Sequence, residues 1–117
     1  MAFRFENLEI WKLAIEYGKK IHQLIKKFPK SEMFGLSADL NRAGISVSSN
    51  IAEGSGSEGN REFKRYLGIA RKSIFETVSQ FVIAQRRKYI TDEEFHSAYC
   101  DGELLVKKVS SFRNSLK

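Results

Sequence analysis

The feature that most constrains the fold is the spacing of apolar residues over 36–54, just ahead of a glycine and serine turn. Mainly apolar or small residues recur in steps of three and four: Leu36, Leu40, Ala43, Val47, Asn50, Ile51 and Gly54. Asn50 is the one polar member of this set. On a helix this spacing places them on one side, forming the seam of a helix packed almost parallel to a neighbour. The segment therefore predicts a helix with a buried face. Asn50 within that face would fix the register or the partner at some cost in stability.

A polar strip runs along one edge of the same helix. Its members are Arg42, Ser46, Ser49 and Glu53, at spacings i, i+4, i+7 and i+11. We interpret the strip as structural rather than catalytic, because such strips commonly serve helix packing. If the helices on either side of the turn at 54–60 run antiparallel, Arg42 lies near Ser73 and Glu76. We therefore predict an ion pair between Arg42 and Glu76, within or between subunits.

Residues 8–28 form the first predicted helix. Two apolar seams interleave along it, one holding Leu8, Trp11, Ile15, Gly18, His22 and Ile25 and the other Ile10, Ala14, Tyr17, Ile21, Leu24 and Phe28. So broad an apolar face predicts a helix buried on two sides, with His22 packed rather than acting as a ligand. The helix should end at or before Phe28, because Pro29 disfavours helical geometry in the residue ahead of it. Residues 30–35 then form a connector.

Residues 60–89 should form the longest helix. Its predicted core face holds Phe63, Tyr66, Leu67, Ala70, Ile74, Val78, Phe81, Val82 and Gln85. Thr91 and Glu94 have the spacing of a capping box, which begins a last helix. Four helices joined by short connections predict an all-α, up-down-up-down antiparallel four-helix bundle, with residues 1–117 as a single domain.

Composition restricts where and how such a chain works. The single cysteine, Cys100, excludes an internal disulfide, so the fold does not depend on an oxidising compartment. The N-terminus has no apolar stretch typical of a signal peptide, and no apolar run approaches the roughly 20 residues that span a bilayer. We therefore expect a cytoplasmic protein without a membrane association.

A second apolar stripe lies opposite the core seam. On residues 36–54 it holds Ala38, Ile45 and Ala52, and on residues 60–89 the same heptad spacing gives Ile69, Glu76 and Ile83, followed by Ile90. A four-helix bundle has no internal use for apolar residues on that side, whereas a neighbouring subunit would bury them. The predicted oligomer interface is therefore Ala38, Ile45, Ala52, Ile69 and Ile83.

The positive charge is concentrated in one part of the chain. The formal net charge is +6, and residues 60–90 carry eight basic side chains against two acidic ones. Basic groups aligned on helices can follow a phosphate backbone with salt-dependent affinity, although a solvated face has the same composition. The candidate nucleic-acid-binding residues are Arg61, Lys64, Arg65, Arg71, Lys72, Arg86, Arg87 and Lys88, joined by Lys19, Lys20 and Lys27 of the first helix.

Several motifs resemble those of the 23S rRNA intervening-sequence proteins, a family of small bacterial four-helix bundles. They are R-A-x-x-S-x-x-S-N-I-A-E-G-S-G from Arg42, E-F-x-x-Y-L-x-I-A from Glu62, S-I-x-E from Ser73, and the upstream L-E-I-W-K-x-A and F-P-x-S-E-x-F-G-L. Two positions depart from the family pattern, Asn41 in place of a basic residue and Lys72 in place of a glycine.

This resemblance has implications for assembly and ligand. It implies a homo-oligomeric ring, with a pentamer favoured, because similar proteins assemble as rings. It also favours a nucleic-acid role, because relatives are encoded within ribosomal RNA insertions. A similar bundle, the accessory variability determinant of diversity-generating retroelements, supports a reverse transcriptase and binds nucleic acid.

Enzymatic chemistry has little support in the sequence. His96 and Cys100 stand at i, i+4, which could pair a thiol with a base, but no third orienting group is evident. Glu93 and His96 have the spacing used in di-iron bundles, yet those need a second Glu-x-x-His, and Lys19 precedes His22 at that spacing. One cysteine and two histidines also fall short of a zinc site. We therefore predict no enzymatic activity, catalytic residue, metal or cofactor.

The sequence favours an oligomeric helical bundle that binds RNA, or less favourably DNA, through basic helix faces. The alternative is a protein-binding adaptor or scaffold whose basic surface meets an acidic partner, with no nucleic-acid role.

Overall fold

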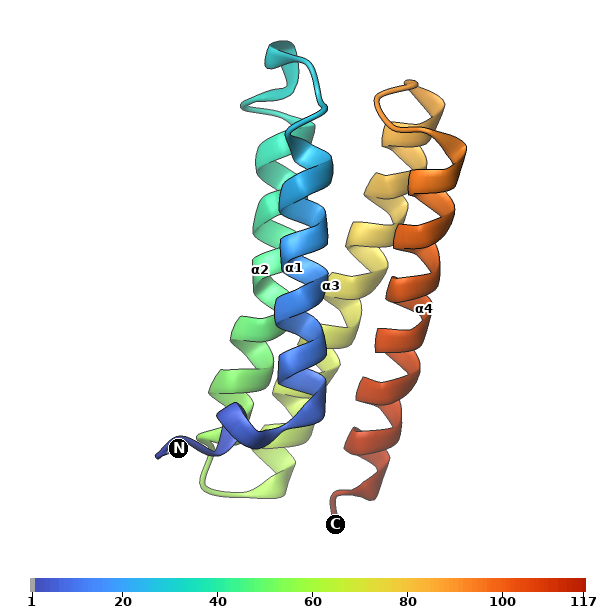
Figure 1. Ribbon diagram of the computed structural model, residues 1–117. Helices are drawn as coiled ribbons and strands as arrows, with labels where there is room; N and C mark the ends of the chain where they lie inside the picture. The colour runs from blue at the N-terminus through green and yellow to red at the C-terminus, as the bar shows by residue number, and fades with distance from the viewer. Residues whose placement is uncertain (1) are drawn as a thin grey trace.

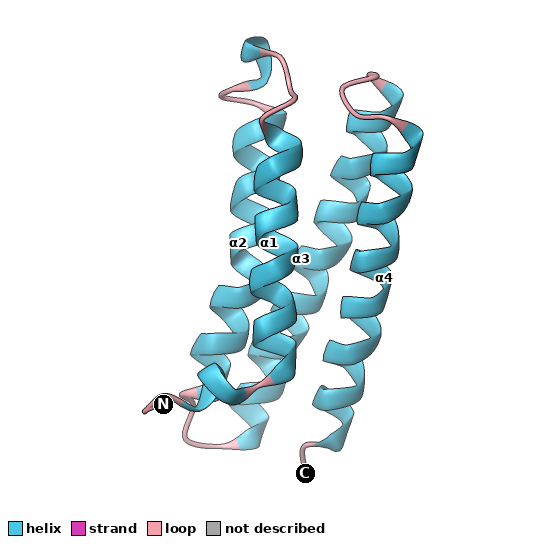
Figure 2. Ribbon diagram, in the orientation of Figure 1, coloured by secondary structure: helices cyan, strands magenta, loops and turns pink. Residues whose placement is uncertain are grey.

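The computed structural model describes residues 2–117 and confirms the predicted all-α helical bundle (Figure 1). Its elements are η1 (Arg4–Asn7), α1 (Glu9–Ile25), η2 (Lys30–Glu32), α2 (Leu36–Ser55), α3 (Asn60–Arg86) and α4 (Asp92–Ser115). Helices dominate and only short loops join them (Figure 2). Consecutive α-helices run in opposite directions, so both termini lie at the same end of a body measuring 43 × 23 × 23 Å.

The helix ends follow the local chemistry of the sequence. α1 ends at Ile25, ahead of Pro29, as predicted. The capping box at the start of α4 is also confirmed: Thr91 Oγ1 accepts from the Glu94 amide at 3.0 Å, and Glu94 Oε1 accepts from the Thr91 amide at 2.8 Å. These two bonds satisfy amide groups that the first turn of a helix otherwise leaves unpaired.

The predicted end of α3 was wrong by three residues, because the helix stops at Arg86 rather than at residue 89. Lys88 adopts a left-handed conformation with φ 64°. Its amide donates to the Gln85 carbonyl, and the Tyr89 amide donates to the Ala84 carbonyl, both at 2.9 Å. This pair of bonds is a Schellman motif, which normally has glycine at the left-handed position. Because this residue is a lysine, the sequence does not indicate that the helix ends here.

The core lies along the axis of the bundle, and α3 is rotated within it relative to the prediction. Ser73, Thr77, Gln80 and Ala84 are buried, whereas the predicted core residues Tyr66, Val78, Val82 and Gln85 are only half-buried. The reason is that α3 packs against α2 more extensively than against α4, which turns its buried face toward α2. The uncharged polar side chains of Ser73, Thr77 and Gln80 are therefore buried in the interior.

The prediction that α1 is buried on two sides was wrong. One of its seams is buried and holds Ile10, Ala14, Tyr17, Ile21 and Leu24. The other seam is half-buried, and His22 within it is exposed. α2 and α4 pack against the first seam, whereas the second is only partly covered, with Phe5 of η1 packed against Trp11 near its start.

Candidate nucleic-acid interface

The basic residues of α3 lie on the side of the helix turned away from α2. Arg61, Arg65, Arg71, Lys72 and Arg86 are exposed and Lys64 is half-buried, whereas Arg87 and Lys88 follow the end of the helix and are also exposed. Within residues 2–117, several of these cations have no carboxylate partner in an ion pair. We call the unpaired group on the helix itself the α3 ridge, consisting of Arg61, Lys64, Arg71, Lys72 and Arg86.

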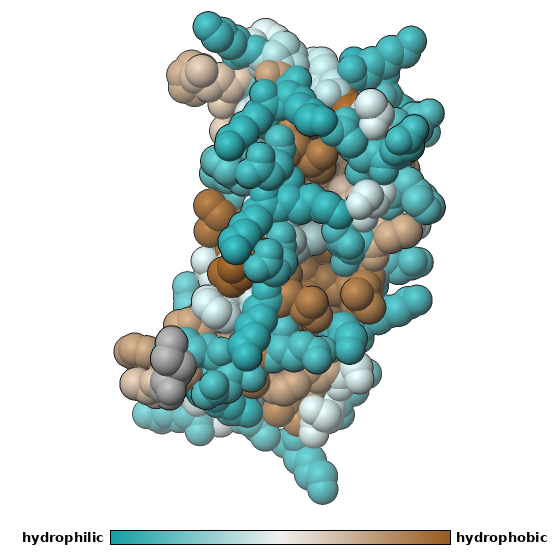
Figure 3. All heavy atoms as spheres, viewed as in Figure 1, coloured by the Kyte–Doolittle hydropathy of each residue, from teal (hydrophilic) through white to brown (hydrophobic). Residues whose placement is uncertain are grey.

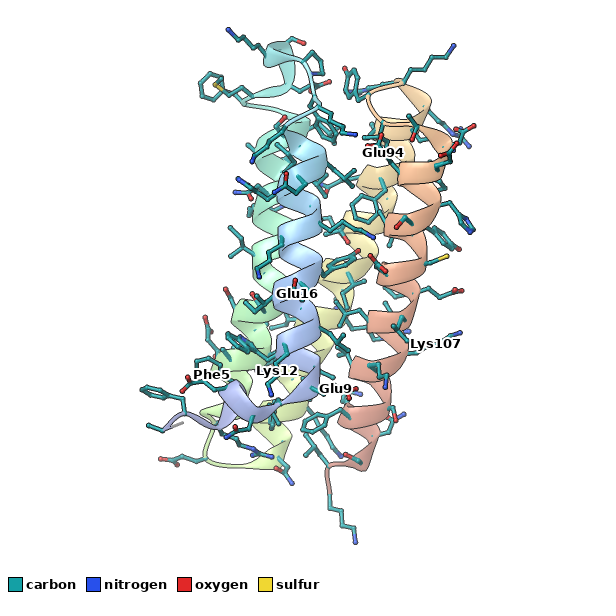
Figure 4. The ribbon with its side chains drawn as sticks, in the orientation of Figure 1. Phe5, Glu9, Lys12, Glu16, Glu94 and Lys107 are labelled. Atoms are coloured by element: carbon teal, nitrogen blue, oxygen red, sulfur yellow. The ribbon has the colours of Figure 1, made fainter. Side chains whose placement is uncertain are left out.

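Five of the predicted cations are instead held in ion pairs: Lys19–Glu16, Lys20–Asp101, Lys27–Glu94, Arg65–Glu62 and Arg87–Glu32. Lys20 and Lys27 connect α1 to α4, and Figure 4 shows Glu94 at the start of α4, near the end of α1. These five residues are weaker candidates for phosphate contacts, because their charges are partly neutralised and because Lys20 and Lys27 also hold α1 against α4. The α3 ridge remains as the strongest part of the predicted surface.

A basic hollow of about 570 Å³ lies where α3 begins and α4 ends. It is lined by Gly59, Arg61, Glu62, Lys64, Arg65 and Arg113. Arg113 is fixed there because its Nε donates to the Lys64 carbonyl at 2.9 Å. The sequence interpretation missed Arg113, since periodicity alone does not show that the last turn of α4 meets the first turn of α3. Arg113 therefore adds a third cation to Arg61 and Lys64 at one end of the ridge.

The middle of the ridge carries an aromatic residue that the sequence interpretation also missed. The Arg71 guanidinium carbon lies 4.9 Å from the centre of the Phe75 ring, and Arg71 Nε donates to Ser110 Oγ at 3.1 Å. Phe75 stands four residues after Arg71, so the i, i+4 spacing on a helix was the available sign. This arrangement holds one cation of the ridge in place beside an exposed ring.

The polar strip of α2 joins α2 to α3. Arg42 Nη2 lies 2.5 Å from Glu76 Oε2, so the expected ion pair is present within one chain. Ser46 Oγ lies 2.9 Å from Ser73 Oγ. Asn50 bonds back to Ser46 of its own helix, at 2.8 Å to the carbonyl and 2.9 Å to the hydroxyl, so its polar group is satisfied without a partner helix.

Three further members of the family motif have different surroundings. Ser49 is half-buried and Glu53 is exposed, whereas Gly54 is buried where α2 meets α3. Arg42 and Ser46 therefore connect α2 to α3, which favours the structural interpretation of the strip.

The apolar stripe has one wrongly assigned member. Ile90 is buried in the core rather than on the outside, because α3 ends at Arg86 and Ile90 lies beyond the helix, in the turn that follows. Ile45 and Ile83 are 54% and 36% exposed, Ala38 is exposed, and Ile69 and Ala52 are half-buried. Ile45 also lines a hollow of about 390 Å³ between α1 and α2, together with Ile15 and Gly18.

A cluster around Glu32 ties the two loops at the other end of the bundle. Its Oε2 accepts from Arg87 Nη1 at 2.6 Å and from the Tyr89 hydroxyl at 2.7 Å, and its Oε1 accepts from the Leu36 amide at 3.2 Å. The bond from Tyr89, followed by the bond from the Leu36 amide, holds the pKa of Glu32 below its usual range. The same carboxylate raises the pKa of Tyr89.

Replacing this carboxylate should therefore destabilise the bundle in a pH-dependent way. Because the folded pKa of Glu32 is lowered, its stabilising effect is complete above the ordinary glutamate pKa of about 4.3 and is lost as the pH falls through the lower folded value. We expect Glu32→Gln to melt below wild type at neutral pH, and the gap to close in acid. Thermal unfolding followed by circular dichroism measures this. Glu58→Gln is the control and should match wild type at every pH, because Glu58 is exposed in a loop and has no ion-pair partner within residues 2–117.

His96 and Cys100 are both exposed on α4, and His96 Nε2 lies 3.6 Å from Cys100 Sγ. Residues 2–117 contain no group of three or more His, Cys, Asp or Glu side chains arranged to hold a metal ion. Over the same residues, no helix combines the length and apolarity needed to cross a membrane.

The fold and surface of residues 2–117 define a small basic antiparallel four-helix bundle in which five cations without an ion-pair partner lie along α3. The chain belongs to the 23S rRNA-intervening sequence protein family, whose model matches residues 6–111. A solved structure from Bacteroides thetaiotaomicron VPI-5482, described as a protein with unknown function from the S23 ribosomal protein family, is similar with a TM-score of 0.83. It is 26% identical, and the match covers 91% of this chain and 96% of that one. No curated protein matches the chain significantly.

Proposed function

We propose that the protein is a non-enzymatic, cytoplasmic, oligomeric bundle that binds RNA through the α3 ridge. The observation that carries this proposal is the charge pairing: among residues 2–117, five predicted cations pair with carboxylates, whereas Arg61, Lys64, Arg71, Lys72 and Arg86 of α3 do not. Unpaired cations aligned on one helix can follow a phosphate backbone and release its counterions, which gives affinity with little sequence preference. Arg113 extends the same charge at one end of the ridge.

A charge-matched pair of variants tests the role of the ridge. The ridge variant carries Arg61→Gln, Lys64→Gln and Lys72→Gln, and the control carries Lys19→Gln, Lys20→Gln and Lys27→Gln, so that both lose three positive charges. RNA binding is measured by fluorescence anisotropy across a salt series. We expect the ridge variant to bind RNA more than about tenfold more weakly than wild type. The slope of log affinity against log salt concentration should be smaller by about two, because each lost phosphate contact lowers it by about 0.7.

The control variant should keep the wild-type slope and most of the affinity. Equal losses in the two variants would show that only net charge matters and would exclude the ridge as the site. If the wild-type protein binds no RNA even at low salt, RNA binding is excluded and the acidic-partner adaptor becomes the better interpretation.

We also propose that several copies assemble into a ring, with a pentamer favoured by the resemblance. The exposed isoleucines Ile45 and Ile83 support this, because a neighbouring subunit would remove them from water. A ring would also repeat the α3 ridge, so that several weak phosphate contacts add through avidity. Light scattering at micromolar concentration measures the mass, and a mass equal to one chain would exclude the ring.

A further inference from the structure

An apolar groove of about 240 Å³ lies between α3 and α4. Its lining residues are Phe75, Val78, Tyr99, Gly102, Glu103, Val106 and Lys107. Phe75 and Tyr99 are 55% and 42% exposed, so each helix presents one aromatic ring to solvent. We call this surface the aromatic groove. Exposed large apolar residues next to one another are unusual on a soluble surface and indicate a binding site.

The groove results from close packing at Gly102. A Cβ atom at this position would lie 2.8 Å from both the Tyr17 hydroxyl oxygen and Val78 Cγ2. Real Cβ atoms do not approach that closely, so the absence of a side chain lets α4 lie directly against α3. Gly102 is buried and Val78 is half-buried beneath the two exposed rings.

The surroundings of the groove are positively charged. Arg71 stacks its guanidinium over Phe75, Lys107 lines the groove, and Lys72 follows on the outer side of α3. Figure 4 shows Lys107 on α4, on the side away from α1. Glu103 is the acidic residue in the lining. Arg71 and Lys107 therefore border the groove, Lys72 is the next residue after Arg71 on α3, and Glu103 is the one carboxylate in the lining.

This combination fits single-stranded nucleic acid. An unstacked base has a flat apolar face that stacks on an aromatic ring, and its neighbouring phosphates need cations a few ångströms away. In a duplex the bases are already stacked on one another and cannot reach a ring on a helix surface. The apolar face of a partner helix would fit the groove less well, because Arg71 and Lys107 would be buried against it without a counter-charge.

We propose that the aromatic groove takes an unstacked base of single-stranded RNA, with the flanking phosphates on Arg71, Lys72 and Lys107. This inference rests on the proposed RNA binding and specifies its substrate as single-stranded rather than duplex.

Anisotropy with two labelled probes tests the proposal: a single-stranded oligoribonucleotide and a hairpin duplex of the same composition. We expect the wild-type protein to prefer the single strand, and Phe75→Ala to weaken single-strand binding about tenfold, the effect of losing one stacked base. The salt slope should not change, because no phosphate contact is removed. Arg71→Gln should instead lower the slope by about 0.7. Phe75→Trp should keep the wild-type affinity for the single strand, since tryptophan also stacks on a base.

Leu104→Ala is the matched control, because Leu104 is 47% exposed on α4 but lines the hollow between α1 and α4. It should leave binding of both probes unchanged. Equal binding of the two probes, or an unchanged affinity in Phe75→Ala while the ridge variant still loses binding, would overturn the groove and leave RNA binding in place. A change in solution mass caused by Phe75→Ala would also overturn it, by identifying the groove as a contact between subunits. If the wild-type protein binds neither probe, the proposed function itself fails.

Discussion

Gly54→Leu should destabilise the bundle by about 3 kcal/mol or more, because the side chain would be forced into a closely packed contact. A Cβ atom at Gly54 would lie 2.7 Å from Tyr66 Cβ and 2.8 Å from Phe63 Cδ1. Tyr66 Cβ is attached directly to the α3 backbone, so it cannot move without displacing the helix. Urea unfolding followed by circular dichroism measures the loss.

A second glycine provides the control. A Cβ atom at Gly18, in the middle of α1, would meet no atom within 4 Å. Gly18→Ala should therefore stabilise the bundle by up to about 1 kcal/mol, since alanine favours a helix over glycine by that amount. Gly54→Ala should instead destabilise it. A stabilising Gly54→Ala, or a wild-type urea midpoint for Gly54→Leu, would contradict the close approach of α2 and α3.

This close approach explains why the N-I-A-E-G motif ends in glycine. Gly54 lies in the last turn of α2, and the chain reverses over Gly56 and Gly59 before α3 begins. Contact of Gly54 with Phe63 and Tyr66 therefore sets the position of the first two turns of α3, which carry Arg61 and Lys64. The motif serves the candidate interface indirectly, by fixing the helix on which the ridge lies.

The sequence predicted the helices well because their signs are local. Proline at 29, the capping box at Thr91 and the glycines after residue 54 each act within a few residues of a helix end. Lys88 is the counter-example: its left-handed conformation depends on how the turn reaches Ile90 and the core, and lysine carries no local preference for it. The prediction therefore extended α3 too far.

The candidate site was harder to predict, because pairing between helices depends on register. Arg42 and Glu76 could be matched in advance, since a short turn fixes how α2 and α3 face each other. Lys20 and Asp101 lie on α1 and α4, which are joined only through the two intervening helices. Periodicity identified Lys20 as exposed and basic, but it could not reveal the carboxylate opposite. For the same reason Tyr99 and Phe75 could not be placed in one groove.

Figure 3 shows another surface that periodicity did not single out, apolar side chains gathered between α1 and α4 on an otherwise largely hydrophilic face. Leu13, Leu104 and Leu105 line a hollow there of about 390 Å³, bordered by the Lys20 and Asp101 pair. α1 packs less extensively against α4 than against α2. The Lys20 contact therefore stabilises the more open of the two α1 interfaces, which is a further reason to regard it as structural.

Thr77→Val should cost about 2 kcal/mol although it keeps the volume of the side chain, because it leaves a buried hydroxyl without a partner. Thr77 Oγ1 donates to the Ile74 carbonyl at 2.6 Å, and it lies 2.6 Å from the Tyr17 hydroxyl oxygen. A hydroxyl has a single proton, so Tyr17 must donate to Thr77. Both residues are buried, and valine offers Tyr17 no acceptor.

A double-mutant cycle with Tyr17→Phe separates this bond from packing. The double variant removes both polar groups, so it should lose less stability than the two single variants lose together. Burial also raises the pKa of Tyr17. The contribution of Tyr17 to the free energy of unfolding is therefore complete below the ordinary tyrosine pKa of about 10 and is lost as the pH rises above that value. Tyr17→Phe should accordingly resist alkaline unfolding better than wild type, relative to neutral pH. Additive losses in the cycle would show that the bond between α1 and α3 contributes nothing beyond shape.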